Sequence, residues 1–462
     1  MKLRNGSGAK GAQGGGDVKA RPVEEKPAAV PAMATQAGEE YARWAWTEAA
    51  VWTERMLTAL EQGVKGGKWF SLIDKVYRMT NLVSAFARVK ANKGAAGVDH
   101  QSSEMFEQHL EANLKRLAAK LREGNYRPQA LLRVWIPKPG SREKRPLGIP
   151  TICDRVVQTA MRAVLEPIFE RIFAAHSYGF RPGRGCKDAL RRVNYLLQQG
   201  YNWVVDADLK SYFDTIPFEP LLARVKEQVA DGAILALIEA YLHQGVLEAM
   251  RYWEPERGTP QGAVISPLLS NIYLNPLDHL LAQQGIEMVR YADDFVILCR
   301  SEADAQRALA LVQQWTATAG LTLHPEKTRI VDATKHGGFD FLGYHFERSY
   351  CWPRTKSLKK FKDKIRVLTK RNNGQSLQVI ISRVNAVTRG WFGYFKHSHY
   401  TTFPNLDKWL RMRLRSILRK RRKRRGRARW PDNKLWPNAF FAAQGLFSLV
   451  TAQAQLRQSS QR

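Results

Sequence analysis

Two adjacent acids between two short apolar runs constrain the fold of this chain more than any other feature. Asp293 and Asp294 separate the runs 288–291 and 295–298, which are rich in β-branched and aromatic residues. Runs of this length predict two paired strands with the acids at the turn. Because neighbouring side chains on a flat strand point to opposite faces, the two carboxylates can approach one point only where the backbone bends. Carboxylates held together repel each other, and a bound divalent cation relieves that repulsion.

A second acidic motif lies upstream of this hairpin. The apolar run that begins at Asn202 ends at Asp208, which predicts a strand that presents an acid at its carboxyl end. About 85 residues with βαβ-like patterning separate Asp208 from the hairpin acids. An Asp-Asp pair alone is more commonly a surface turn, but two acidic motifs with apolar flanks favour a shared site. We therefore predict a palm, an antiparallel sheet with helices on one face that gathers acids from different strands.

The predicted acid cluster is suited to Mg²⁺. Every candidate ligand is a hard carboxylate oxygen, and no Cys/His cluster competes for the metal. Two divalent ions held by such acids lower the pKa of an attacking 3′-hydroxyl and neutralise a leaving pyrophosphate. An alternative zinc site would combine His345, Cys351, His397 and His399. The spacing of these residues matches no zinc-binding pattern.

The charge of the chain predicts a polyanionic partner. The formal net charge is +31, with 73 Lys and Arg residues against 42 Asp and Glu residues. Between Pro353 and Arg429 there are 25 Lys and Arg residues and two acids, so about three quarters of the excess charge lies in one sixth of the chain. A solvated polar face would mix the two signs. Nucleic acid is therefore the expected partner.

Three features of the sequence bear on where the protein resides. No run of about eighteen uncharged apolar residues occurs, so no membrane association is expected. The first forty residues contain no apolar core of a signal peptide. The four cysteines are too widely spaced for a disulfide framework and predict thiols in a reducing compartment. We expect a cytoplasmic protein, in the bacterial cytoplasm or nucleoid.

Composition and periodicity divide the chain into four segments. Residues 1–38 are rich in Gly, Ala, Pro and Lys, and we expect them to be disordered. Residues 39–350 mix helical and strand patterns and include the predicted palm. Residues 351–420 contain three amphipathic helices with short links, which predict a helical bundle. Residues 421–462 form a basic C-terminal tail, a candidate DNA-binding segment that continues the cationic run 419–429.

Two basic loops are candidates for phosphate contacts. One is the tip of the expected hairpin 131–149, and the other is the Gly/Arg loop before the expected helix 189–198. Their main cations are Lys138, Arg142 and Arg145 in the first loop, and Arg181, Arg184 and Lys187 in the second. Exposed amides at the start of a helix beside cations can hold a phosphate. The alternative for both is a soluble, tight loop without a ligand.

Four motifs occur in the chain in one order. They are Arg145-Pro-Leu-Gly-Ile-Pro150, Asp208-Leu-Lys-Ser-Tyr-Phe-Asp214, Gly258-Thr-Pro-Gln-Gly262 and Tyr291-Ala-Asp-Asp294. Together they resemble the motifs of group II intron-encoded reverse transcriptases, also called maturases, over about residues 60–420. The segment Arg389-Gly-Trp-Phe-Gly-Tyr-Phe395 resembles the signature of the maturase (thumb) region. This resemblance implies an α+β right-hand polymerase fold, with fingers and palm (antiparallel sheet plus helices) followed by an α-helical thumb/maturase bundle.

The resemblance also assigns roles to matching positions. Asp208 and Asp293 would bind both Mg²⁺ ions, and Asp294 would complete the acidic set. Lys327 would protonate or screen the departing pyrophosphate. For the incoming dNTP, the implied contacts are Lys138 and Arg145 to the triphosphate, and Gln261 in the nucleotide pocket.

Phe213 would select the sugar of the nucleotide. It lies five residues after Asp208, where the family places an aromatic ring beneath the incoming sugar. A clash with a ribose 2′-hydroxyl would cost ~1–3 kcal/mol, roughly tenfold to a hundredfold in favour of dNTPs. Asp206 and Asp214 would support the site without binding metal.

The function that the resemblance implies is RNA-directed DNA polymerisation, a nucleotidyl transfer. The chain would also bind group II intron RNA, assist its splicing and copy it at a DNA target by target-primed reverse transcription. The implied partners are the intron RNA, an RNA template and a DNA primer or target. No paired cysteines follow Cys351, so no H-N-H endonuclease activity is expected. Two alternatives stay open: a catalytically inactive RNA-binding splicing factor, and a host-recruited reverse transcriptase in DNA repair or defence.

The basic segment 353–429 generates the first prediction. If it neutralises six to ten phosphates, RNA affinity should fall by roughly 10³–10⁵ between 50 and 200 mM salt, because each contact releases condensed counterions. Filter binding of a structured RNA over a salt series measures the slope. A flat response would contradict a polyanionic partner.

Overall fold

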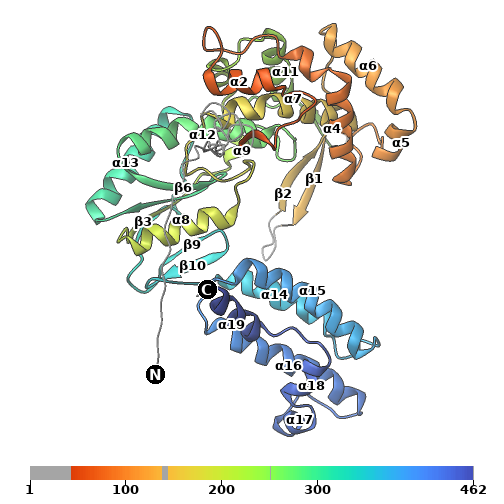
Figure 1. Cartoon of the computed structure of the whole chain (residues 1–462), viewed down its shortest axis with the longest axis vertical. Helices are drawn as coiled ribbons and strands as arrows, with labels where there is room; N and C mark the ends of the chain where they lie inside the picture. Colours follow the sequence, from red (N-terminus) through yellow and green to blue (C-terminus); the bar gives the residue numbers. More distant parts are fainter. Residues whose placement is uncertain (1–42, 138–143, 250, 461–462) are drawn as a thin grey trace, which may run out of the picture. The chain divides into compact units, whose positions relative to one another are not determined.

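The computed structural model describes residues 43–137, 144–249 and 251–460 (Figure 1). The expected N-terminal tail 1–38 and the predicted triphosphate ligand Lys138 lie outside the described residues. All elements described below lie in one compact unit that begins at residue 46. None of the helices described has the length and apolar character needed to cross a bilayer.

The fingers combine helices with a small mixed sheet. The helices are α2 (Glu54–Gln62), α3 (Ile73–Val76), α4 (Met79–Ala91), α5 (Ser103–Gln108), α6 (Leu110–Arg122) and α7 (Ile152–Glu170). The strands, in the order β2-β1-β4-β5, are β2 (Lys144–Ile149), β1 (Leu131–Pro137), β4 (Val246–Glu248) and β5 (Arg251–Trp253). The antiparallel pairing of β1 with β2 confirms the hairpin predicted over 131–149. Thr151 caps the start of helix α7, because its hydroxyl accepts a hydrogen bond from the Asp154 amide, and the helix buries most of its length.

The palm is an antiparallel sheet with the order β6-β7-β3-β8. Its strands are β3 (Trp203–Asp208), β6 (Glu287–Tyr291), β7 (Asp294–Cys299) and β8 (Arg329–Asp332). The pairing of β6 with β7 confirms the predicted acidic hairpin, and β3 confirms the predicted strand ending at Asp208. Four helices connect these strands or pack beside them: α9 (Tyr212–Thr215), α10 (Phe218–Lys226), α11 (Gly232–Leu242) and α13 (Glu302–Thr318).

The two faces of the palm sheet carry different layers. On one face, Val204, Val289 and Val296 share a core with α8 (Cys186–Gln198) and with the strands β9 (Phe339–Phe341) and β10 (Tyr344–Glu347). The opposite face packs against α12 (Ser266–Gln283) and α13 (Figure 1). Because side chains alternate along a strand, this two-layer arrangement decides which face each acid can occupy.

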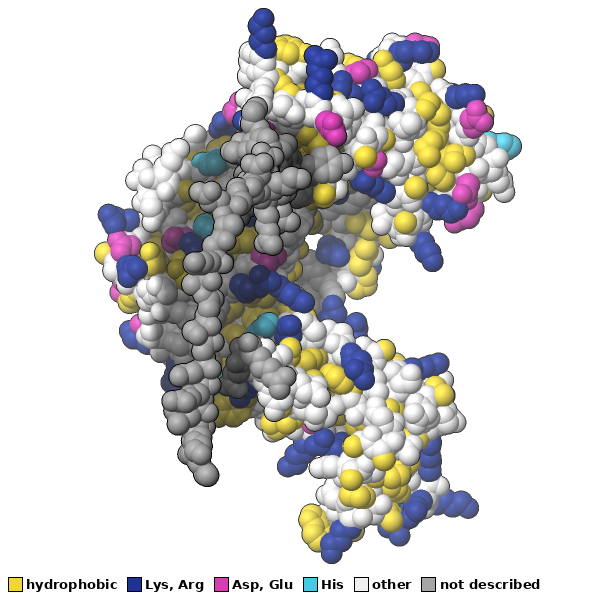
Figure 2. Space-filling model, viewed as in Figure 1, with side chains coloured by type: hydrophobic (Ala, Val, Ile, Leu, Met, Phe, Trp, Pro, Cys, Tyr) yellow, Lys and Arg dark blue, Asp and Glu magenta, His cyan; other side chains and the backbone are white. Residues whose placement is uncertain are grey.

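The thumb is a bundle of six helices among the described residues. Strand β11 (Tyr350–Pro353) pairs with β10 and leads into it. The helices are α14 (Thr355–Leu368), α15 (Leu377–Phe395), α16 (Thr402–Arg421), α17 (Trp430–Leu435), α18 (Asn438–Ala443) and α19 (Leu449–Ser460). The first three confirm the helices predicted between 351 and 420. Figure 2 shows Lys and Arg side chains spread over the thumb with few acids among them.

The thumb core extends past residue 420, where a boundary with a basic tail was expected. Trp436, Phe441 and Leu449 are buried in the same cluster as Phe361 and Leu414 from the earlier helices. The acid Asp432 is buried and paired with Arg419, at 3.0 Å between Oδ2 and Nη1. The described part of segment 421–462 therefore belongs to the thumb and is not a separate tail, although its cations remain exposed.

Removing the Phe441 ring tests this continuity. Phe441 is fully buried, so Phe441→Ala should lower the free energy of unfolding by about 3–5 kcal/mol, as a large cavity replaces the ring. Urea unfolding followed by tryptophan fluorescence measures the change, and Leu435→Ala, at an exposed position on α17, is the control. Equal, small effects of both substitutions would show that the segment is not part of the core.

Candidate active site

The palm sheet brings the predicted acids to one end and one face. Asp208 and Asp294 are direct register partners on β3 and β7. Asp208 is four residues from Val204, and Asp294 is two residues from Val296, so both acids share the face that holds these valines. Asp293 occupies the two-residue turn between the paired residues Tyr291 and Asp294. The convergence predicted from the sequence is therefore present in the backbone.

A close backbone contact supports the turn. Ala292 has a φ of +61°, in the left-handed region that a tight two-residue turn requires. The segment 176–179 runs alongside β6, with the Tyr178 amide donating to the Arg290 carbonyl at 2.8 Å. A Cβ on Gly179 would lie 2.2 Å from the Ala292 nitrogen, which no real contact allows. Gly179 is thus required for this segment to approach the turn.

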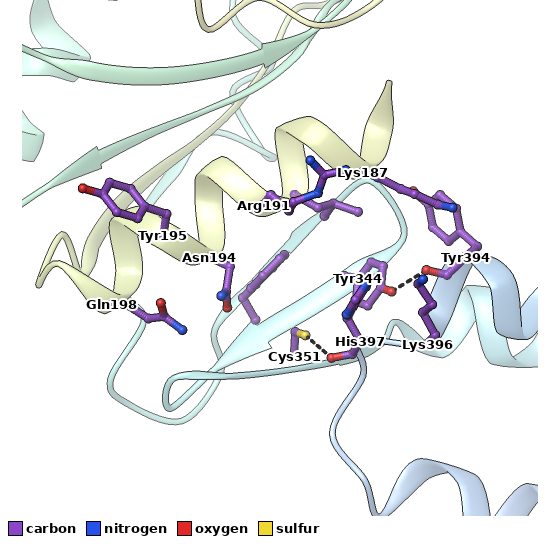
Figure 3. A pocket seen from close by; sticks show the side chains of 12 residues that line it. Lys187, Arg191, Asn194, Tyr195, Gln198, Tyr344, Cys351, Tyr394, Lys396 and His397 are labelled. Atoms are coloured by element: carbon purple, nitrogen blue, oxygen red, sulfur yellow. Dashed lines mark hydrogen bonds between the residues drawn. The ribbon is translucent and has the colours of Figure 1, made fainter. Parts of the chain in front are cut away.

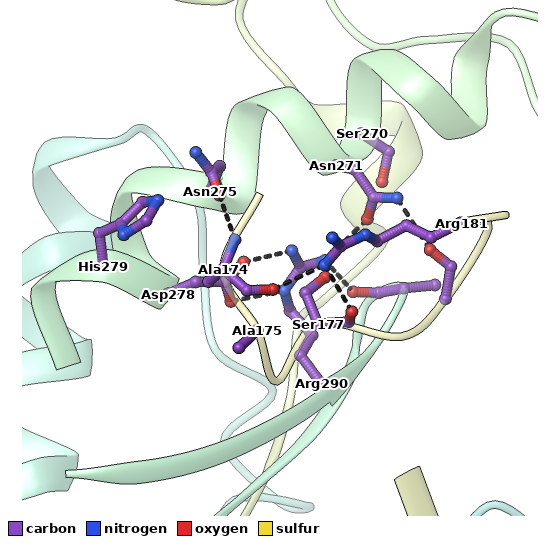
Figure 4. Close-up of polar contacts among 12 residues, drawn as sticks. Ala174, Ala175, Ser177, Arg181, Ser270, Asn271, Asn275, Asp278, His279 and Arg290 are labelled. Atoms are coloured by element: carbon purple, nitrogen blue, oxygen red, sulfur yellow. Dashed lines mark hydrogen bonds and ion pairs between the residues drawn. The ribbon is translucent and has the colours of Figure 1, made fainter. Parts of the chain in front are cut away.

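Arg290 holds the same turn from the opposite face of the sheet. Its side chain is fully buried, and Nε donates to Asp278 Oδ1 on α12 at 2.7 Å (Figure 4). Nη1 donates to Asn271 Oδ1 and to the Ala292 carbonyl, each at 2.9 Å. Asn271 in turn donates to the Gly179 carbonyl at 2.8 Å. The network joins α12, the turn and its supporting segment into one unit.

Sequence reasoning did not identify Arg290 or its partners. The available signal was an arginine inside an apolar strand, directly before the acidic turn. A buried guanidinium must be paired and hydrogen-bonded, which predicts an acid from another element nearby. Nothing in the sequence shows that this acid is Asp278.

Burial and then the neighbouring negative charges raise the pKa of the acids. Burial raises the pKa of Asp294 to about 7, and the neighbouring carboxylates of Asp293, then Asp206 and Asp208, add to the effect. The pKa of Asp293 is also raised, mainly by burial and then by Asp208. Mutual repulsion of this kind marks a site that favours positive charge.

Two cations lie against the acids of β3. Lys327 Nζ is 2.5 Å from Asp208 Oδ2, and the segment before it is held by a hydrogen bond from the His324 amide to the Asp208 carbonyl. Arg329 Nε is 3.3 Å from Asp206 Oδ2. The structure therefore places Lys327, predicted to act on pyrophosphate, beside the acid predicted to bind metal.

The acids do not form a closed ligand set. Across the described residues, no three His, Cys, Asp or Glu side chains are gathered closely enough to hold a metal by themselves, and this includes the alternative zinc residues. Mg²⁺ in phosphate-transfer sites is usually bound by one or two carboxylates together with substrate phosphates. The repelling acids at the end of β3 and β7 fit a metal held in that way.

Backbone contacts bring the predicted nucleotide-binding motifs together. Phe213 lies on α9, and its carbonyl accepts a hydrogen bond from the Thr259 amide at 2.6 Å. On the other side of the same loop, the Gln261 carbonyl accepts from the Gly148 amide of β2 at 2.7 Å. Arg145 is exposed on β2, three residues before Gly148. The loop 258–262 therefore links the motif of Phe213 to the strand of Arg145.

A cavity of about 740 Å³ extends from Asp294 along the thumb. Its lining includes Asp294 and Tyr394, together with the cations Arg354, Lys360 and Lys364. Arg354 Nε is buried and has no hydrogen-bond partner in the described part of the chain. A buried donor without a partner is costly, so an anionic ligand in this cavity would satisfy it.

Arg181 does not have the phosphate-binding role considered for its loop. It is buried, with Nη2 at 2.7 Å from Glu170 Oε1 and Nη1 donating to the Ala174 and Ser177 carbonyls. All of these contacts are internal (Figure 4). For Arg181, the tight-loop interpretation is therefore correct, because its charge is already neutralised.

Comparison with known proteins agrees with this geometry. The family model for the reverse transcriptase (RNA-dependent DNA polymerase) matches residues 136–346, and the group II intron, maturase-specific domain matches residues 358–436. The group II intron-encoded protein LtrA of Lactococcus lactis subsp. cremoris is 38% identical over 208 residues, 45% of this chain and 34% of LtrA. The match thus spans about a third of LtrA.

Two further matches differ in extent. Protein YkfC of Escherichia coli (strain K12) is 31% identical over 351 residues, which cover 66% of this chain and 86% of YkfC. Among solved structures, the partial Cas6-RT-Cas1–Cas2 complex aligns with 54% of this chain and 41% of that chain, at 27% identity and a TM-score of 0.36. An overlap at that level does not define a shared fold by itself. With its reverse transcriptase domain followed by a maturase-specific domain, the chain belongs to the group II intron-encoded reverse transcriptase and maturase family.

Proposed function

We propose that this protein polymerises DNA on an RNA template, with Asp208, Asp293 and Asp294 as the acids that bind two Mg²⁺ ions. The observation that carries the proposal is the pairing of Asp208 with Asp294 on one face of the palm, beside the turn that holds Asp293. The raised pKa of Asp294 supports the proposal. A buried carboxylate beside other carboxylates is stabilised in its ionised form by a bound cation.

The surrounding residues have separate tasks in this proposal. Phe213 and Gln261 define the nucleotide pocket, and Arg145 contacts the triphosphate from the fingers. Lys327 neutralises Asp208 before substrate binds and screens the pyrophosphate afterwards. Bound Mg²⁺ would lower the pKa of the primer 3′-hydroxyl and stabilise the negative charge of the pyrophosphate.

The cavity beside Asp294 supports a path for the primer. Arg354, Lys360 and Lys364 follow one another along the start of the thumb and line the same cavity as the acid. Cations at this spacing can contact successive phosphates of a nucleic-acid backbone and so fix its register without reading its sequence. The primer terminus would then lie next to the acids.

The thumb carries the second part of the proposal. Its excess of Lys and Arg and its match to the maturase-specific domain support binding of group II intron RNA, help in splicing, and mobility by target-primed reverse transcription. A splicing factor without polymerase activity is the competing function. The intact set of acids favours the polymerase, as does the buried Arg354 Nε, which has no hydrogen-bond partner among the described residues.

Replacing Asp294 tests the electrostatic account. A carboxylate with a raised folded-state pKa destabilises the fold as pH rises from its ordinary value of about 3.9 to about 7, because the unfolded chain releases the proton first. In metal-free buffer, Asp294→Asn should therefore raise the melting temperature at pH 8, with the gain disappearing towards pH 4.

Differential scanning fluorimetry with a chelator measures this dependence. The control is Asp332→Asn on β8, since hydrogen bonds from Thr334 lower the pKa of that half-buried acid and its loss should give no gain. A pH-independent change in Asp294→Asn would contradict the crowding of charges at the site.

Replacing Asp293 tests the polymerase itself. Asp293→Asn should reduce primer extension on an RNA template by roughly 10²-fold or more, because the substitution removes a charge at the centre of the site. Affinity for RNA should stay nearly unchanged. The matched control, Asp332→Asn, should retain activity. A collapse of RNA binding in Asp293→Asn would show that the acid is structural, and an inactive wild type with Mg²⁺ and dNTPs would favour the splicing factor.

A further inference from the structure

A second cavity lies outside the polymerase site, between α8 and the strands that lead into the thumb. Its volume is about 660 Å³, within the usual range for small-ligand sites of roughly 300–1,000 Å³. One wall is the exposed face of α8, and the other consists of β10, β11 and the residues after α15 (Figure 3). The two cavities have only Tyr394 in common.

The floor of this cavity is aromatic. Tyr344 and Phe346 of β10 are almost completely buried and form part of the lining, together with Tyr394. The Tyr344 hydroxyl donates to the Tyr394 carbonyl at 2.7 Å, which ties the strand to the end of α15. Tyr195 stands at the rim and is 51% exposed, with the Arg192 guanidinium 5.4 Å from its ring centroid. The exposed ring of Tyr195 is a stacking surface for a base, whereas the buried rings close the floor.

The rim of the cavity is cationic and contains no acid. Lys187, Arg191 and Lys396 line it, and Figure 3 shows them on both walls. Arg191 is paired with Asp188, at 3.1 Å, but its side chain is 74% exposed. Burial and then these cations lower the pKa of His397. The cavity therefore has a positive potential that no lining residue cancels.

Two side-chain amides add hydrogen-bonding capacity. Asn194 and Gln198 are one helical turn apart on α8, so both face the cavity, as their presence in its lining shows. Each amide offers a donor and an acceptor, as the edge of a base does. The cavity thus combines a stacking surface, amides and cations, and its lining contains no acid. These features suit an unstacked nucleotide, with a free base and a phosphate.

We propose that this cavity binds an unpaired nucleotide of a structured RNA, such as a bulged base, at a site separate from the primer and template. The proposal deepens the proposed RNA-binding function and rests on it for the class of ligand. A base in the cavity would stack on Tyr195 above the aromatic floor, with its edge near Asn194 and its phosphates near Lys187 and Lys396. Double-stranded RNA presents no free base and would not fill the cavity.

Binding of two RNA hairpins tests the proposal. One hairpin carries a single bulged uridine, and the other has the same stem fully paired. Wild-type protein should bind the bulged hairpin about tenfold more tightly at fixed salt, because the paired stem has no unpaired base that could stack in the cavity. Asn194→Ala and Lys396→Glu should each remove most of this preference.

The control is a matched charge reversal outside the cavity. Lys420→Glu, at an exposed position near the end of α16, should weaken both hairpins equally and keep the preference. Primer extension on poly(rA) and oligo(dT) should remain unchanged in Asn194→Ala, which separates this site from the polymerase. If the wild-type protein prefers the bulged hairpin but does not extend a primer, only the proposed polymerase function is refuted. Equal binding of both hairpins by the wild type, or loss of the preference in Lys420→Glu, would refute the nucleotide site.

Discussion

The buried ion pair between Arg290 and Asp278 is the interaction on which the arrangement of the palm depends. Burying two charges is costly, and this pair is tolerated because two guanidinium nitrogens donate to the Asp278 carboxylate and a third hydrogen bond joins the guanidinium to Asn271. Removing one partner would leave an uncompensated charge, which typically costs about 3–5 kcal/mol. The same guanidinium holds the Ala292 carbonyl, so the pair fixes the turn as well as the helix beneath it. The position of Asp293 is thereby determined by a network on the opposite face of the sheet.

Stability and function conflict at the acids. Asp294 carries a raised pKa because it is buried and its neighbours are also negative, and this is a free-energy cost that the rest of the palm must offset. Lys327 offsets part of it at Asp208, and Arg354 lowers the pKa of Asp294 from the thumb side. Such local destabilisation is common where a site must receive a ligand of opposite charge. The rigid layers of α8 and α12 on either face keep the acids in place despite their repulsion.

Local patterns made much of this fold predictable. The acidic hairpin, strand β3 and the first three thumb helices follow from periodicity within single segments. Strands β4 and β5 span three residues each, which is too few for a periodic pattern. The parallel pairing of β4 with β1 cannot be predicted from either segment alone. The helices after Arg421 were missed because cations dominate that composition, while the buried residues Trp436 and Phe441 are few.

The candidate site was predictable where a residue type alone suggests its chemistry. Adjacent acids indicated a cation, and the sheet brings Asp208 and Asp294 together as expected. Arginines were less informative, because the residue serves two opposite purposes. Arg181 and Arg290 are internal braces, whereas Arg354 has a donor free for a ligand within the described residues. Only burial and partners, which depend on distant segments, distinguish these cases.

The central position of β3 has a consequence for how the protein is made. Asp206 on β3 pairs with Arg329 on β8, 123 residues later. Strand β3 therefore has no β8 to pair with when it first leaves the ribosome. At a synthesis rate of about 5–20 residues per second, it waits on the order of 6–25 s for that neighbour. During this interval, an apolar strand with open edges is exposed to other nascent chains. Slower translation would lengthen that interval and increase the demand for chaperones.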